Sequence, residues 1–398
     1  MVQTSLSDGV KEELRAILPE LIAFRRDLHQ HPEPSGREAE TARKVRKNLE
    51  AYGYTVRSVG KTGLYTVLHG KEEGPDITLR ADMDALPITE QSTYPYPSKH
   101  PGLMHACGHD VHTTAVLGAA RYLALHKEKL SGTVRFLFQH AEEQGHGSQD
   151  FLKEGLTEGT ERIYGFHVSP QEPLGCVVLS EGADFASCDS MKIRLFGDSA
   201  HIARPHMGSD VTLCAADLIL HLHTLKSLLD PLQPALIGVG KVSSGTAWNV
   251  LSDHGEIEGT VRCFSETYRK QLLGRVEQII ESVCKVHHVR AEVEFDQNAP
   301  CLINDREAGK TMQQAAEQAV GKDNVFVRQT PFGFGADDFA AFTGTVPGCF
   351  LHVGTAIDSE PGSKASLHSP GVYIPDEAVG IGCEILIRCA LFHLENAK

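Results

Sequence analysis

Short apolar runs that alternate with a helical pattern are the feature that most restricts how this chain can fold. Four runs rich in branched and aromatic residues predict buried strands, at 77–81, 133–139, 162–168 and 349–353. Between the first two, residues 110–126 predict a helix with Asp110 as its N-cap. Further helices are predicted at 14–28, 38–52, 307–320 and 376–394. Strands alternating with helices predict an α/β domain with a mostly parallel sheet flanked by helices.

The pattern changes after Ser190, which suggests a second domain. The next elements are predicted as strand, helix, strand, strand, helix and strand, at 191–196, 212–229, 235–242, 255–264, 266–287 and 289–295. This β-α-β-β-α-β order is that of a ferredoxin-like unit. A chain of 398 residues also exceeds the length of about 250–300 residues at which single cores stop growing. We expect one domain formed by 1–183 and 298–398, and an inserted domain formed by 184–297.

The composition restricts the partners and the compartment. With 38 Lys and Arg against 52 Asp and Glu, the net charge is −14, which disfavours nucleic acid and anionic membranes as partners. Residues 1–19 lack the basic start and apolar stretch of a signal peptide, and no run of eighteen uncharged apolar residues predicts a membrane span. The ten cysteines are scattered, which favours free thiols. We expect a cytoplasmic protein that acts on a small molecule.

Metal-ligating residue types gather at the ends of the predicted strands. Residues 104–112 read Met-His-Ala-Cys-Gly-His-Asp-Val-His, and Glu142-Glu143 follows the strand at 133–139. Thiolate, imidazole and carboxylate donors suit borderline divalent metals. The carboxyl ends of strands meet along one edge of an α/β sheet, so these segments predict one metal site and a metallohydrolase. The candidate ligands are Cys107, His109, Glu143, His167 and His368.

Each candidate also has an ordinary structural interpretation. A single histidine is more often a satisfied polar residue than a ligand, so the prediction depends on several separate segments supplying ligands. Adjacent carboxylates can divide their roles, and we assign Glu143 as ligand and Glu142 as general base. Asp84 is expected to orient a ligand from behind, and the alternative is a turn residue ahead of Pro87.

Seven segments, taken in order, resemble one known family. They include Arg-Ala-Asp-Met-Asp-Ala-Leu-Pro at 80–87 and Met-His-Ala-Cys-Gly-His-Asp at 104–110, and the others lie at 25–33, 141–143, 165–168, 200–206 and 367–370. The chain resembles the amidohydrolase branch of the co-catalytic metallopeptidase family, which includes carboxypeptidase G, aminoacylases, hippurate hydrolases and plant hydrolases of indole-acetyl amino acids. The resemblance implies a zinc-exopeptidase-like catalytic domain and an inserted lid and dimerisation domain, and therefore a homodimer.

The resemblance also implies a cofactor and roles for individual residues. It implies two divalent ions on the five candidate ligands, with zinc or manganese expected first and cobalt or nickel as alternatives. It implies that His201 steadies the oxyanion and that Asn249, Arg262 and His206 contact the substrate. For Arg262, a surface charge at a strand edge is an equal alternative.

Three positions depart from the family pattern. Asp82 stands where other branches have a ligand histidine, His140 replaces a proline two residues before Glu142, and Ser252 replaces a proline three residues after Asn249. Cys107 would then supply the donor that the missing histidine gives in other branches.

We therefore expect a metal-dependent amidohydrolase that cleaves an N-acyl amino acid into a carboxylic acid and a free amino acid. The expected route is attack by a water shared between the metals, with Glu142 as general base. One alternative is a dipeptidase or carboxypeptidase on the same scaffold. Another is a non-catalytic, metal-dependent binding protein, which the intact Glu142 and the complete ligand set disfavour.

Overall fold

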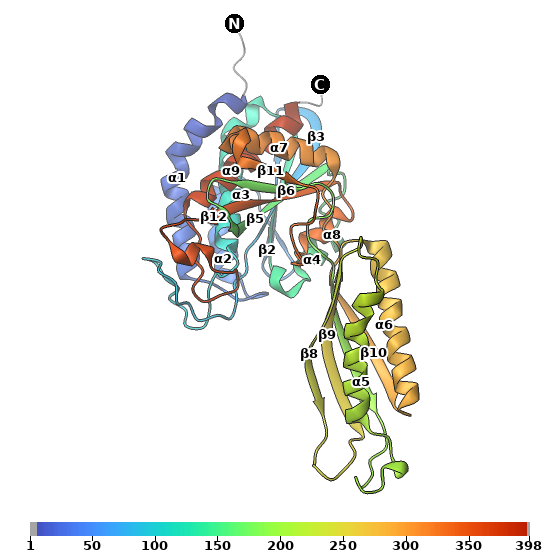
Figure 1. The fold of residues 1–398 in the computed structure, drawn as a ribbon. Coiled ribbons are helices and arrows are strands. Elements are labelled where there is room, and N and C mark those ends of the chain that lie inside the picture. Colours follow the sequence, from blue (N-terminus) through green and yellow to red (C-terminus); the bar gives the residue numbers. More distant parts are fainter. Residues whose placement is uncertain (1–5, 396–398) are drawn as a thin grey trace. The chain divides into compact units, whose positions relative to one another are not determined.

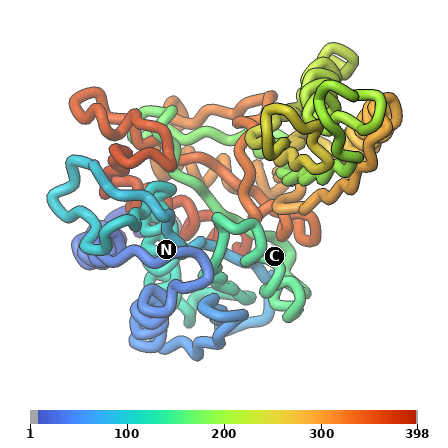
Figure 2. Tube along the Cα trace, turned by 90° about the horizontal axis from the view of Figure 1, so that it is seen from below, coloured from blue at the N-terminus to red at the C-terminus, as the bar shows by residue number. Residues whose placement is uncertain are grey.

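The structure is a computed structural model that describes residues 6–395, and it divides into two compact units. The large unit contains the chain up to Asp184, then Ile303–Phe332, and then the chain from Asp337 onward. The small unit contains Phe185–Leu302 together with the short segment Gly333–Ala336. In the trace of Figure 2, the residues of the small unit, coloured from green to orange, form a group of their own.

The large unit is built on an eight-stranded mixed sheet with the order β1-β2-β4-β3-β5-β12-β6-β11 (Figure 1). Its four central strands run parallel to one another, and they are β4 (Ser131–Gln139), β3 (Glu72–Asp82), β5 (Arg162–Pro173) and β12 (Gly348–Ala356). The outer strands are β1 (Arg57–Val59), β2 (Gly63–His69), β6 (Val177–Ser180) and β11 (Val325–Arg328). Strands β2 and β6 pair antiparallel with the central strands, β1 pairs antiparallel with β2, and β11 pairs parallel with β6. The predicted α/β class is confirmed, with the parallel pairing concentrated at the centre.

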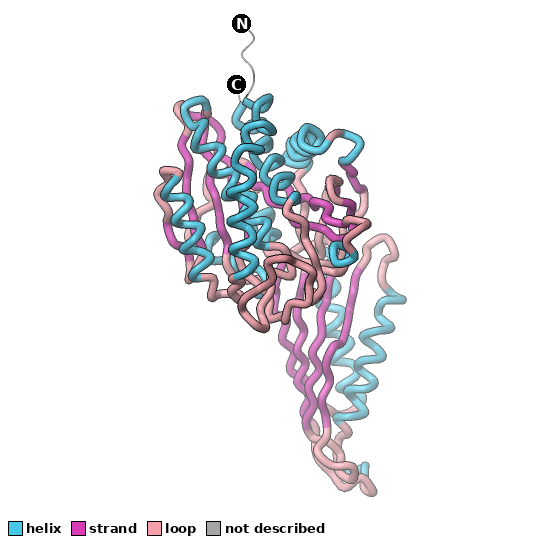
Figure 3. The backbone as a smooth tube through the Cα atoms, turned by 90° about the vertical axis from the view of Figure 1, so that its left-hand side faces the viewer, coloured by secondary structure: helices cyan, strands magenta, loops and turns pink. Residues whose placement is uncertain are grey.

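Helices cover both faces of this sheet, and Figure 3 shows the long helices that lie over its strands. The long helices pack against one another in one layer, and they are α1 (Leu6–Gln30), α3 (His109–His126), α7 (Arg306–Val320) and α9 (Glu377–Glu395). Gly165 and Phe166 are neighbours in β5, so the Cβ directions of the two residues face opposite sides of the sheet. A Cβ at Gly165 would meet Phe339 of α8 (Phe339–Thr343), whereas a Cβ at Gly382 of α9 would meet Phe166. Helices α8 and α9 therefore lie on opposite faces.

Two further helices complete the large unit. Helix α2 (Ala39–Ala51) packs on α3 and β2, and the short helix α4 (Gly147–Lys153) packs on α8.

The small unit is a four-stranded antiparallel sheet with two helices. In chain order its elements are β7 (Cys188–Phe196), α5 (Val211–Thr224), β8 (Ala235–Ser244), β9 (His254–Cys263), α6 (Glu266–Val286) and β10 (Arg290–Ala299). The strand order in space is β10-β7-β9-β8, so β8 and β10 are its edges. Residues 211–228, which include α5, are apolar and long enough to cross a membrane by composition alone. One third of this stretch is buried, and the inward side chains of α5, such as Leu218, belong to the core of the small unit.

The start of α3 differs from the prediction, because Asp110 is not its N-cap. The helix begins at His109 after Gly108, whose φ of 87° and close approach to Val168 and Ile374 leave no room for a side chain. Asp110 lies in the first turn, fully buried, where Oδ2 lies 2.8 Å from Arg25 Nε and 2.9 Å from His29 Nδ1. A buried carboxylate requires such partners, and this requirement outweighs its capping tendency.

We expect Arg25→Met to lower the free energy of unfolding by about 3–5 kcal/mol, because it leaves Asp110 as a buried charge without its cation. Denaturant unfolding of the variant and the wild type at neutral pH measures the difference. The control is Arg26→Met, because Arg26 is 48 % exposed and pairs with Asp376 at the surface. That change should cost less than about 1 kcal/mol. Equal losses in the two variants would contradict the importance of the buried pair.

Candidate active site

The five predicted metal ligands come together in the large unit, near the carboxyl ends of its central strands, and His167 lies within β5. Cys107 Sγ lies 3.3 Å from His167 Nε2 and 3.2 Å from His368 Nε2. Glu143 Oε1 lies 3.2 Å from His368 Nε2 and 3.9 Å from His109 Nε2. Among residues 6–395, donor atoms close enough to share an ion form five groups of three, and two of these groups contain Cys107. They are Cys107 with His109 and His167, and Cys107 with Glu143 and His368.

Local backbone structure explains how these side chains reach one point. Glu143 lies in the 3-10 turn Glu142–Gln144 that follows β4, and Ala141 before it adopts a left-handed φ of 51°. Cys107 and His109 flank Gly108 at the start of α3. His368 has a φ of 63°, and its backbone N–H donates to Ala106 O at 3.0 Å, beside Cys107.

Hydrogen bonds to the Nδ1 atoms orient the rings of two of the histidines. Asp84 Oδ1 lies 3.1 Å from His109 Nδ1, and His167 Nδ1 donates to Val168 O at 2.7 Å. In both rings Nδ1 is engaged, which presents Nε2 to the cluster. Asp84 Oδ2 also accepts from Ser35 Oγ at 2.6 Å and from Glu143 N at 3.0 Å. Burial opposes ionisation, but these hydrogen bonds prevail and lower the pKa of Asp84.

The residues of the cluster fit divalent cations. His109 Nε2 and Glu143 Oε1 are buried and have no hydrogen-bond partner, although such atoms are normally satisfied. Burial raises the pKa of Glu142 well above its usual range, and the charges of Asp337, Glu143 and Asp338 add to this effect. Bound cations would satisfy the unpaired atoms and offset the excess of negative charge.

The neighbourhood of Glu142 contains residues that the sequence analysis missed. Asp337 and Asp338 are 3 % and 1 % exposed, and Asp338 N donates to Glu142 Oε1 at 3.2 Å. Arg80, also buried, lies 2.6 Å from Asp82, 3.2 Å from Asp337 and 2.9 Å from Asp338. Burial raises the pKa of Asp338 to about 7, although Arg80 opposes this. The available signal was an acidic pair beside the apolar run 339–342, the same pattern that identified Glu142 and Glu143.

Asp82 has a supporting position behind the ligands. Its Oδ1 accepts from His112 Nδ1 at 2.7 Å, and His112 Nε2 accepts from Val168 N at 3.1 Å. Both ring nitrogens of His112 are therefore occupied. Asp82 ionises readily despite burial, because His109, His112 and Arg80 hold its pKa well below the usual range. His112 is a further residue that the sequence analysis did not select.

The two other departures from the family pattern have structural explanations. The His140 ring is buried, its Nε2 lies 3.1 Å from Asp150 Oδ2, and it packs close to Gly60 and Gly63. Ser252 Oγ accepts from Gly245 N at 3.0 Å and donates to His254 O at 2.6 Å. Ser252 therefore closes the loop between β8 and β9 with side-chain hydrogen bonds.

The remaining predicted site residues lie in the small unit, at two ends of the β8–β9 hairpin. His201 forms a bridge with Val250, and Ile202 N donates to Asn249 O at 3.0 Å, so His201 and Asn249 lie on neighbouring segments. His206 lies in the exposed turn Pro205–Met207. Arg262 lies near the other end of β9, where its Nη1 donates to Phe334 O at 2.8 Å. The eight residue steps from 254 to 262 span roughly 26 Å, so the hairpin separates Arg262 from Asn249.

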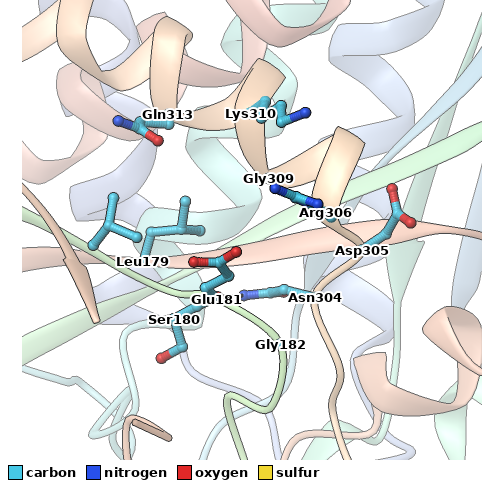
Figure 4. A pocket seen from close by; sticks show the side chains of 11 residues that line it. Leu179, Ser180, Glu181, Gly182, Asn304, Asp305, Arg306, Gly309, Lys310 and Gln313 are labelled. Atoms are coloured by element: carbon cyan, nitrogen blue, oxygen red, sulfur yellow. Dashed lines mark hydrogen bonds between the residues drawn. The ribbon is translucent and has the colours of Figure 1, made fainter. Parts of the chain in front are cut away.

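A cavity of about 190 Å³ also lies in the large unit, at the opposite end of the sheet (Figure 4). Its lining includes Asn304 and Asp305, which hydrogen-bond the first residues of β12 through Phe350 O and Gly348 O. Glu181, Arg306 and Lys310 also line it. The candidate metal-ligand cluster lies near the carboxyl ends of the central strands, so this cavity is separate from the candidate active site.

The fold agrees with comparisons to known proteins. A model of the peptidase family M20/M25/M40 matches residues 78–391. The chain belongs to this family. It is therefore a hydrolase with the family's α/β fold, as its resemblance to co-catalytic metallopeptidases predicted.

Several known proteins resemble the chain over most of its length. N-acetyl-L-cysteine deacetylase of Bacillus subtilis is 38 % identical over 387 residues, covering 97 % of this chain and 89 % of the relative. N-acyl-L-amino acid amidohydrolase of Geobacillus stearothermophilus is 37 % identical, covering 74 % of this chain and 81 % of the relative. Among solved structures, a dinuclear metal-binding M20 peptidase of Bacillus subtilis has a TM-score of 0.83 and 34 % identity, covering 96 % and 99 % of the two chains.

Proposed function

We propose that this M20 protein is a metal-dependent amidohydrolase that cleaves N-acyl amino acids into a carboxylic acid and a free amino acid. The observation that carries the proposal is the meeting of Cys107, His109, Glu143, His167 and His368, with Glu142 beside them. The names of the two deacylating relatives support the substrate class. All ten cysteines are unpaired, which supports a reducing, cytoplasmic location.

The five clustered side chains would hold two divalent cations. The dinuclear site of the related peptidase supports this number. A thiolate and imidazoles favour zinc, the carboxylate suits manganese, and cobalt or nickel are alternatives because metal availability also decides occupancy. When bound, such cations lower the pKa of water and polarise a carbonyl oxygen.

Side chains of this protein would then move protons and bind the substrate. Glu142 takes the proton from the attacking water and passes it to the leaving amine. Asp84 keeps His109 and Glu143 in place through the contacts to their Nδ1 and N atoms. From the small unit, His201 donates to the developing oxyanion, while Asn249, Arg262 and His206 contact the substrate amide or carboxylate.

We propose a homodimer formed through the small unit. Arg262 and the His201–Asn249 pair lie at opposite ends of the β8–β9 hairpin, too far apart for one acylated amino acid to touch both from a single chain. A second chain can supply one of these groups. Exposed apolar side chains on α5 and the edge strand β8 support such an interface, and they include Leu213 at 56 %, Leu220 at 65 % and Val242 at 51 % exposure.

We expect the double variant Leu213→Glu/Leu220→Glu to be monomeric and to lose most of its turnover, because charges would replace the apolar face of α5. Sedimentation velocity gives the mass, and an assay on the same samples gives the activity. The matched control is Leu125→Glu, which changes a leucine that is 70 % exposed in the large unit. A monomeric wild type with full turnover would refute the dimer.

We expect chelator-sensitive release of free amino acid from acetyl and benzoyl amino acids, with slower cleavage of dipeptides. The assay uses protein of known metal content, before chelation, after chelation and after refilling with zinc or manganese. Faster cleavage of dipeptides would favour the peptidase alternative. Acyl amino acids that bind the metal-loaded protein without release of product would favour the binding-protein alternative.

A further inference from the structure

The side chain of Asp338 is held in place by donors from three elements. Its carboxylate accepts from Arg80 Nη2 of β3 at 2.9 Å, and from Gln139 Nε2 of β4 at 2.6 Å and 2.8 Å. It also accepts from Ser148 N of α4 at 2.9 Å. Arg80, Gln139 and Asp338 are all at most 2 % exposed. A residue bonded in this way has little freedom to shift.

The backbone N–H of the same residue forms a hydrogen bond with Glu142. Asp338 N donates to Glu142 Oε1 at 3.2 Å. A hydrogen bond to one carboxylate oxygen fixes the rotation of the group and thereby sets the direction of the other oxygen, Oε2. Proton transfer requires the base to be placed within hydrogen-bond reach of its target, so this direction matters for the reaction.

The charge pattern of the cluster differs from that of a structural ion pair. In the small unit, Arg269 pairs with one buried carboxylate, Asp189, through two contacts of 2.8 Å, and its other partner, Glu266, is 47 % exposed. Arg80 instead faces Asp82, Asp337 and Asp338. Burying this excess of negative charge disfavours folding, and such arrangements are found where function requires them.

We propose that Asp338 is a positioning residue for Glu142, and that Arg80 and Gln139 hold it in place for this purpose. The proposal rests on the proposed function, in which Glu142 is the general base. The backbone N–H of Asp338 sets the carboxylate of Glu142, and the buried side chain of Asp338 anchors that N–H.

The test uses Asp338→Asn in the full-length, metal-loaded protein. Asparagine keeps the shape but cannot accept all of the hydrogen bonds, so the N–H at position 338 loses its anchor. We expect kcat to fall about 10–100-fold with KM changed less than about 2-fold, because small displacements of a catalytic group have effects of this size. Metal content should stay unchanged. The control Asp189→Asn removes a buried carboxylate of the small unit and should leave kcat unchanged.

A double-mutant cycle separates a positioning role from general loss of structure. If Asp338 acts through Glu142, adding Asp338→Asn to Glu142→Gln should lower the residual single-turnover rate less than about 2-fold. A further 10-fold drop, loss of metal in Asp338→Asn, or unchanged kcat in that single variant would overturn the proposal. If Asp338→Asn does not fold, Gln139→Met removes two of the hydrogen bonds and should lower kcat about 3–10-fold, with the same result in the cycle. A wild type that hydrolyses no acyl amino acid would instead refute the proposed function.

Discussion

Glu142→Gln should lower kcat about 10²–10⁴-fold and leave the metal content unchanged. Glutamine has almost the same size and can still accept the hydrogen bond from Asp338 N, so the local structure should persist. It cannot take a proton from water or deliver one to the leaving amine. The rate should therefore fall without loss of the cations. Steady-state kinetics on an N-acetyl amino acid and elemental analysis of the same preparation measure the two quantities.

The control for this change is Glu158→Gln, an exposed glutamate of the large unit, which should keep full turnover and metal content. Two results would contradict the assignment of Glu142. Retained turnover would mean that another group moves the proton. Loss of metal would make Glu142 a ligand, for which it is close enough, since it groups with His109 and Glu143.

Cys107→Ala should remove at least one of the two cations and lower kcat at least about 10²-fold. The reason is geometric, because the Cys107 thiol belongs to two of the groups of three that can share an ion, and these two groups together contain all five predicted ligands. Burial and the charge of Glu143 raise the pKa of the Cys107 thiol, so the metal-free site disfavours the thiolate. A bound cation reverses this preference by stabilising the thiolate. Metal analysis after gel filtration and kinetics at saturating metal measure the outcome.

The matched control is Cys389→Ala, which removes a fully buried thiol from α9. It should retain its metal and its turnover and cost only the small free energy of a lost core contact. If Cys107→Ala kept two cations with wild-type affinity, the thiol would not be a ligand, and the donor set would have to be completed by another residue such as Asp82.

Four of the five candidate ligands were predictable because each follows a recognisable local pattern. Glu143 and His167 lie at or beyond the ends of apolar runs that become parallel strands, and Cys107 and His109 flank the start of a helix. Parallel strands bring their carboxyl ends to one edge, so local patterns were sufficient to place distant residues together. The contact between Arg80 and Asp338 was not predictable, for the opposite reason. Arg80 and Asp338 are 258 residues apart, and the sequence next to either residue does not indicate that they are in contact.

Asp110 shows how tertiary structure overrides a local rule. Before an apolar helical pattern, an aspartate favours the N-cap position, and the prediction followed that preference. The packing of α1 on α3 instead places Arg25 and His29 beside Asp110 in a site that water does not reach. The ion pair there outweighs the value of a cap.

The sequence by itself determined the α/β class, the M20 resemblance and the candidate ligands, because periodicity, strand ends and ligand types are properties of neighbouring residues. Only the tertiary structure decided which polar groups surround Glu142, that Asp82 supports the cluster from behind, and that Arg262 lies apart from Asn249. These features depend on burial and on pairs of distant charges. The free energy of such groups depends on packing and on the loss of water. No short stretch of sequence determines either of these.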